Sequence, residues 1–231
     1  YDASSPLIFS SGLFLFLFAG FLLVYSAFRR APMARIVYVI AFSLYFYYKS
    51  SGVYFLLLVF AAASDFLIAR GIYRTRKRSL KRWLVVLSVA VNLGMLGYFK
   101  YTGMFIDVLN RVCGALGFAL RLPQVDILLP VGISFFVFKN ITYLVAVYKG
   151  SLAAEKNPLY CFAYTGFFAQ LTSGPIQRAE SLLPQLKSPP AFDRALALNG
   201  CVRLCWGIFL KKCLADHFAA YYNALYQPDH Y

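Results

Sequence analysis

The chain has 231 residues, of which 61% are hydrophobic and only 14% are charged, and its formal net charge is +14. A soluble domain of this size carries about 25% charged residues. Because the apolar residues also come in long blocks, the composition excludes an ordinary soluble domain and indicates an integral membrane protein. The basic residues lie in short loops between apolar blocks, a pattern that reports the orientation of a protein in a membrane. We therefore expect membrane lipids as partners and no nucleic acid.

The first apolar blocks predict an all-α, polytopic membrane protein. Residues 7–27 can cross a hydrocarbon core of about 30 Å at about 1.5 Å per residue. Residues 36–48 are short for a full span, and residues 53–69 follow after a turn. Asp65 lies late in this third segment, where we expect it to pair with a nearby basic residue at the headgroup level.

Two basic loops predict the orientation. Arg29, Arg30 and Arg35 lie before the second apolar segment, and seven arginines and lysines lie between residues 70 and 82. If both loops face the cytoplasm, segments 36–48 and 53–69 form a hairpin that points outward, and the N-terminus lies outside.

The middle of the chain is less regular. Residues 83–99 predict a further span, in which Gly94 and Gly97 allow close approach of another helix. Residues 100–122 have the pattern of an amphipathic helix that lies in the membrane interface. Residues 127–147 are apolar but broken near their start by Pro130 and Gly132.

The last third contains short elements. Residues 160–171 are too few to cross a membrane and predict a re-entrant helix. Residues 182–194 contain three prolines and predict a loop. Residues 196–215 predict a helix that Asp193 or Asn199 caps.

Two groups of polar residues interrupt the apolar pattern. Residues 172–180 include Gly174, Pro175, Gln177 and Arg178, and Lys139 and Asn140 lie within a long apolar run. Such residues are costly in a bilayer unless they line a cavity or its mouth. We therefore predict that Lys139, Asn140, Gln177 and Arg178 line a water-accessible funnel.

Each of these residues also has a structural interpretation. Arg178 can hold a phosphate or carboxylate through two hydrogen bonds, or form an ion pair with Glu180 or Asp216. Gln177 can orient a carbonyl or satisfy backbone groups of the loop. Gly174 and Pro175 are expected to shape a turn.

The cysteines and histidines do not predict a metal site or a complete catalytic centre. The five cysteines lack a CxxC pair, and we expect buried, reduced thiols, although Cys201 and Cys205 share a helix face. His217 is expected to be an interfacial residue near a helix end, and His230 lies beside the chain end.

Several motifs resemble the membrane-bound O-acyltransferase (MBOAT) family, in its bacterial branch that modifies polysaccharides such as alginate. The motifs are LPVGISFF at 129–136, SGPIQR at 173–178 and WGIFLKK at 206–212, with shorter matches at 7–11, 97–101, 141–144 and 147–150. They follow one another in register over nearly the whole chain.

The resemblance implies the amino-terminal part of a single membrane domain, here residues 1–231, in a multi-pass protein of the bacterial inner membrane. It implies transfer of an acyl group, most simply acetyl, from a cytoplasmic thioester such as acetyl-coenzyme A for O-acetylation of an exported polysaccharide. No bound cofactor is implied, and an extracytoplasmic acetyltransferase or polymer-export protein is the implied partner.

The same resemblance places a catalytic histidine on a later helix, beyond Tyr231, so we expect this chain alone to be inactive. Two other functions fit the residues. D-alanyl transfer to teichoic acid belongs to the same branch, and a transporter or export scaffold would also contain broken helices with polar residues at mid-depth.

Overall fold

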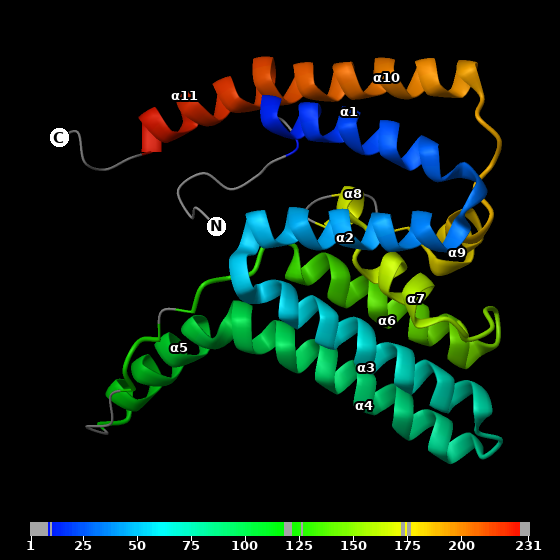
Figure 1. The fold of residues 1–231 in the computed structure, drawn as a ribbon. Helices are drawn as coiled ribbons and strands as arrows, with labels where there is room; N and C mark the ends of the chain where they lie inside the picture. Colours follow the sequence, from blue (N-terminus) through cyan, green and yellow to red (C-terminus); the bar gives the residue numbers. More distant parts are fainter. Residues whose placement is uncertain are drawn as a thin grey trace. The chain divides into compact units, whose positions relative to one another are not determined.

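The computed structural model describes residue 9 and residues 11–117, 122–125, 127–171, 174 and 177–226. Over this part of the chain the regular secondary structure is entirely helical, which confirms the all-α prediction (Figure 1). The α-helices are α1 (Gly12–Ala27), α2 (Pro32–Ser51), α3 (Phe55–Arg74), α4 (Arg78–Leu96), α5 (Thr102–Ala115), α6 (Ile133–Lys149), α7 (Pro158–Thr165), α8 (Phe168–Leu171), α9 (Ala179–Lys187), α10 (Arg194–Phe209) and α11 (Asp216–Tyr226). Short 3-10 or π segments join some of them: η1 (Phe28–Arg30), η2 (Gly52–Tyr54), η3 (Gly97–Tyr101) and η4 (Leu210–Ala215).

The chain divides into two compact units. Of the described residues, the first unit, which we call the hairpin unit, contains 24–188, and the second, the terminal unit, contains those up to Leu23 and from Pro189 onward. The hairpin unit holds α2 to α9 and all the predicted funnel residues.

The hairpin of α2 and α3 sets the direction of the other helices in this unit. Gly52 ends α2 with a positive φ of 59°, which favours glycine, and the chain then returns as α3. The Oγ of Ser51 accepts a hydrogen bond of 3.0 Å from the backbone N–H of Val131, just before α6. The turn end of the hairpin and the start of α6 therefore lie together, and the basic loops lie at the opposite end.

The core of the hairpin unit is built around α3, which packs against α4, α6 and α7. One apolar cluster, with Leu58, Phe136 and Val137, lies toward the turn end. A second, with Ile72 and Leu144, lies toward the basic end and includes residues of α7 and α9. Along both α3 and α6, polar residues lie between these two clusters.

Within the part of the chain that the structure describes, three apolar helical stretches are long enough to cross a membrane: residues 12–30, 32–74 and 78–115. The second includes the α2–α3 hairpin, and each of its two helices has 20 residues. The prediction of a short second segment was therefore wrong, because Pro32 begins α2 four residues before the apolar pattern does.

The third stretch continues from α4 through η3 into α5. The five residues Gly97–Tyr101 form a π segment, which lets the helix continue into the amphipathic residues that follow. Within the described residues no atom lies within 4 Å of a Cβ built on Gly94 or Gly97, so these glycines do not serve the close helix contact that the sequence suggests.

The predicted loop at 182–194 is also wrong over its first half, because α9 extends to Lys187 despite Pro184. Leu182 and Leu183 are buried, and their burial in the core stabilises the helix against the loss of one backbone hydrogen bond.

In the terminal unit, α10 begins at the cap that the sequence predicts. The Asp193 carboxylate accepts hydrogen bonds from the backbone N–H groups of Ala195 and Leu196. Cys201, Cys205 and Cys213 are exposed in this unit, and only Cys161, in the hairpin unit, is fully buried, so the expectation of buried thiols holds for one cysteine.

Candidate functional site

A layer of buried polar side chains crosses the hairpin unit between its two apolar clusters. We call it the polar layer, and it consists of Asp65, Ser88, Asn92, Lys139, Asn140, Thr165 and Gln170. These residues come from α3, α4, α6, α7 and α8, and each is at most 9% exposed. The predicted residues Lys139 and Asn140 therefore do not face acyl chains but lie inside the helical packing.

Lys139 occupies one side of this layer. Its ammonium donates a 2.9 Å hydrogen bond to the Oε1 of Gln170, and it lies 4.6 Å from the centre of the Tyr164 ring. Among the described residues, no carboxylate lies within ion-pair distance of this ammonium. A buried cation held only by an amide oxygen and an aromatic face retains capacity for an anionic or carbonyl group.

Asn140 occupies the other side, because adjacent residues of a helix point about 100° apart. Its Oδ1 accepts a 2.9 Å hydrogen bond from the hydroxyl of Thr165 in α7. Its Nδ2 is buried and makes no hydrogen bond within the described residues.

The sequence prediction was wrong for Asp65. Its carboxyl group is 1% exposed and accepts hydrogen bonds from the Ser88 hydroxyl at 2.7 Å and from the Asn92 amide at 3.0 and 3.2 Å. It therefore lies in the core with neutral partners and not at the headgroup level with a basic one. Ser88 and Asn92 lie four residues apart on one face of α4, a spacing that could have predicted a shared partner.

The second predicted polar group is joined to the first through Tyr164. The hydroxyl of Tyr164 lies 3.3 Å from the backbone oxygens of both Lys139 and Gln177. Gln177 is half-buried, and this contact involves its backbone and not its amide. The structure therefore brings the segment that contains Gln177 beside the middle of α6.

Gly174 is required by close packing. A Cβ at this position would lie 3.1 Å from the Cα of Gln170 and 3.3 Å from the backbone oxygen of Ala169. The segment can approach α8 only because this side chain is absent. Pro175, the other residue of the predicted turn, lies outside the described residues.

Arg178 is exposed, unlike Lys139. It directly precedes α9, and its backbone oxygen accepts hydrogen bonds from Ser181 and Leu182. Within the described part of the hairpin unit its guanidinium makes no ion pair, so the predicted pair with Glu180 does not form, and the pair with Asp216 of the terminal unit stays a prediction. Glu180 instead accepts a hydrogen bond from Ser151, and the hydrogen bond from Lys211 holds the pKa of Asp216 below its usual range.

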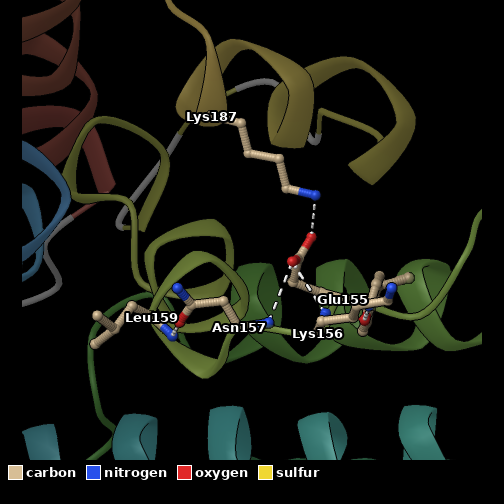
Figure 2. A network of polar contacts seen from close by, with 6 residues as sticks. Glu155, Lys156, Asn157, Leu159 and Lys187 are labelled. Atoms are coloured by element: carbon tan, nitrogen blue, oxygen red, sulfur yellow. Dashed lines mark hydrogen bonds and ion pairs between the residues drawn. The ribbon is translucent and has the colours of Figure 1, made fainter. Parts of the chain in front are cut away.

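A further polar network lies at the basic end of the hairpin unit, and the sequence did not predict it (Figure 2). The buried carboxylate of Glu155 pairs with the ammonium of Lys187 at 2.5 Å and accepts backbone hydrogen bonds from Lys156 and Asn157. Asn157 then caps α7 by accepting a hydrogen bond from Leu159. The Asn-Pro pair at the start of a helix was the signal that could have located this network.

Neither a metal centre nor a catalytic histidine lies in the polar layer. The described residues contain no cluster of three or more histidine, cysteine or acidic residues that could hold a metal ion. His217 is exposed in the terminal unit, 3.2 Å from the backbone oxygen of Lys212, and His230 lies outside the described residues. The polar layer thus provides buried hydrogen-bonding groups and one ammonium group, and none of its residues is a histidine.

These features define a helical protein with apolar helices of membrane-spanning length and a buried polar layer. No family model and no solved structure matches the chain. The chain is 35% identical over 93% of its length to the probable alginate O-acetylase AlgI of Pseudomonas aeruginosa, and 34% identical over 92% to that of Azotobacter vinelandii. It is also 28% identical over 92% of its length to a peptidoglycan O-acetyltransferase of Helicobacter pylori.

The chain is therefore homologous to these bacterial O-acetyltransferases, as the motifs in the sequence predict. It spans less than half the length of the relatives it matches, namely 41%, 42% and 46% of these three.

Proposed function

We propose that this chain is the amino-terminal part of a membrane-bound O-acyltransferase that O-acetylates an exported polysaccharide. The observation that carries the proposal is the homology to two kinds of polymer O-acetyltransferase over more than nine-tenths of the chain. The buried polar layer supports it, because polar and charged groups at this depth are expensive and mark a path for a polar substrate.

In this proposal Lys139 and Arg178 have different roles. The Lys139 ammonium, with Gln170 beside it, lines the path and holds a carbonyl or anionic group of the passing substrate. Arg178 is exposed and binds the phosphates of the donor at the mouth. Asn140 lines the same path, and Gln177 positions the loop that carries Arg178.

The donor is acetyl-coenzyme A or another acyl thioester on the cytoplasmic side, and both basic loops face the cytoplasm, which places the N-terminus outside. The base that takes the proton from the acceptor hydroxyl would be the histidine that the family resemblance places beyond Tyr231, because His217, the histidine that the structure describes, is exposed and not part of the polar layer. The 231-residue chain alone would therefore not transfer acetyl groups. An extracytoplasmic acetyltransferase or polymer-export protein would complete the transfer.

The relative from Helicobacter pylori supports a second acceptor. Its name specifies peptidoglycan, whereas the Pseudomonas and Azotobacter relatives are named for alginate. Peptidoglycan is therefore the second candidate polymer. D-alanyl transfer to teichoic acid and a transport function remain alternatives that the same experiment separates.

Deletion of the gene in the source bacterium tests the proposal. We expect the ester-linked acetyl groups of one exported polymer to disappear, as measured by proton NMR of the purified polymers, and to return when the full-length protein is supplied. Loss of alanyl esters with normal acetyl esters would instead establish D-alanyl transfer. Polymer that is retained inside the cell but remains fully acetylated would establish transport, and either result overturns the proposal.

A further inference from the structure

An apolar groove lies on the hairpin unit, between α2, α3 and α7. Its volume is about 420 Å³, within the range of about 300 to 1,000 Å³ for small-molecule sites. The residues that line it are all apolar: Ile40, Leu44, Val59, Ala62, Ala63, Phe66, Leu67, Pro158, Leu159 and Phe162. It is separate from the polar layer, none of whose residues lines it.

The groove has one charged end. On α3, its lining begins at Val59 and ends at Leu67, one turn before Arg70. The guanidinium of Arg70 lies 5.6 Å from the centre of the Phe66 ring, which lines the groove, and donates a hydrogen bond of 3.3 Å to the backbone oxygen of Lys156. Lys156 in turn lies two residues before Pro158, at the start of the α7 wall.

The end of the groove near Arg70 carries a net positive charge. The nearest carboxylate on the α6–α7 loop is Glu155, which is buried and neutralised by Lys187 (Figure 2). Lys156 and Asn157 also donate their backbone N–H groups to Glu155. Arg70 is half-buried and Lys156 is exposed, and within the described residues neither pairs with a carboxylate.

We propose that this groove binds one anionic phospholipid, with an acyl chain along the apolar lining and the phosphate at Arg70 and Lys156. The lining offers almost no polar group to a substrate, whereas an acyl chain requires none. The two cations at one end select an anionic headgroup, because each basic residue near an anionic lipid adds a modest amount to the free energy of binding. The site is independent of the acyl-transfer function proposed above.

Lipid retention by the purified protein tests this site. The protein is exchanged into detergent with equal amounts of phosphatidylglycerol and phosphatidylcholine that have the same acyl chains, and the bound lipids are counted by native mass spectrometry. We expect preferential retention of one phosphatidylglycerol. Removing one cation, as in Arg70→Gln or Lys156→Gln, should lower this preference about fivefold, and Ala63→Trp should fill the groove and remove retention of both lipids.

The matched controls are Arg82→Gln and Val86→Trp on α4, which make the same changes away from the groove and should leave retention unchanged. Equal retention of the two lipids by the wild-type protein, or normal retention by Ala63→Trp, would overturn the proposal. So would a loss of thermal stability in Ala63→Trp with unchanged lipid retention, which would indicate a protein helix in the groove.

Discussion

Lys139 and Arg178 are both basic residues that interrupt apolar sequence, yet one is buried and the other is exposed. Lys139 lies within a helix and is 3% exposed, with Gln170 and Tyr164 as its partners. Arg178 lies between two short helices and is exposed, without an ion-pair partner in the described part of the chain. A cation on a helix that packs on several sides is forced into the core, whereas a cation in a loop reaches the surface. The predictions below test whether the buried group and the exposed group differ in function as they do in environment.

The largest effect on stability is expected at Asp65, in the polar layer. Asp65→Leu leaves the Ser88 hydroxyl and the Asn92 amide without their acceptor, which should cost about 2 kcal/mol of stability. The thermal midpoint of the purified protein in detergent measures this loss. Asp65→Asn retains an acceptor oxygen and serves as the control, and an Asp65→Leu protein as stable as Asp65→Asn would show that the polar layer does not hold the helices together.

The direct comparison of Lys139 with Arg178 is the second test, in the full-length protein. Lys139→Met removes a buried cation but keeps its volume, so membrane abundance should persist while polymer acetylation falls about tenfold. Arg178→Ala should lower acetylation by less, up to about fivefold, because an exposed charge contributes up to about 1 kcal/mol.

Quantification of polymer acetyl groups at matched membrane abundance checks both variants. Acetylation that is unchanged in Arg178→Ala would remove Arg178 from the site. Acetylation that is unchanged in Lys139→Met would reduce the polar layer to a structural role.

A smaller effect is expected at Gly174, where the segment that leads to Arg178 packs against α8. Gly174→Ala places a Cβ 3.1 Å from the Cα of Gln170 and should destabilise the protein by about 1 kcal/mol. The thermal midpoint measures the change against the wild-type protein, and Gly200→Ala on α10, where a Cβ meets no atom within 4 Å, should not lower it. A Gly174→Ala midpoint no lower than that of the wild-type protein would show that the segment does not need this close approach.

The smallest effect is expected at the network in Figure 2. Lys187→Met removes the partner of Glu155, but Lys187 is 45% exposed and Glu155 keeps two backbone hydrogen bonds, so the loss should be about 0.5 kcal/mol. Added salt should lower the thermal midpoint of the wild-type protein toward that of the variant, because salt screens the ion pair. A wild-type midpoint that does not respond to salt would contradict a contribution from this pair.

The sequence by itself determined the helical class, the apolar segments and the Asp193 cap, and it singled out Lys139 and Asn140 as polar residues within an apolar run. These properties depend on residues close together in the chain: hydropathy over one helix length and hydrogen bonds across one turn. At α2 the sequence analysis overlooked a local signal, Pro32 at the helix start, whereas its error at α9 arises where long-range packing overrides a local pattern. Leu182 and Leu183, for example, keep a helix through Pro184 because they are buried against other helices.

Only the tertiary structure decided which polar residues meet. The contacts of Asp65 with Ser88 and Asn92 span 23 and 27 residues, and that of Lys139 with Gln170 spans 31. Local periodicity has no information on such pairs, because their distance depends on how α3, α4, α6 and α8 pack. The same holds for the groove on α2, α3 and α7, whose lining residues each look in the sequence like ordinary apolar helix positions.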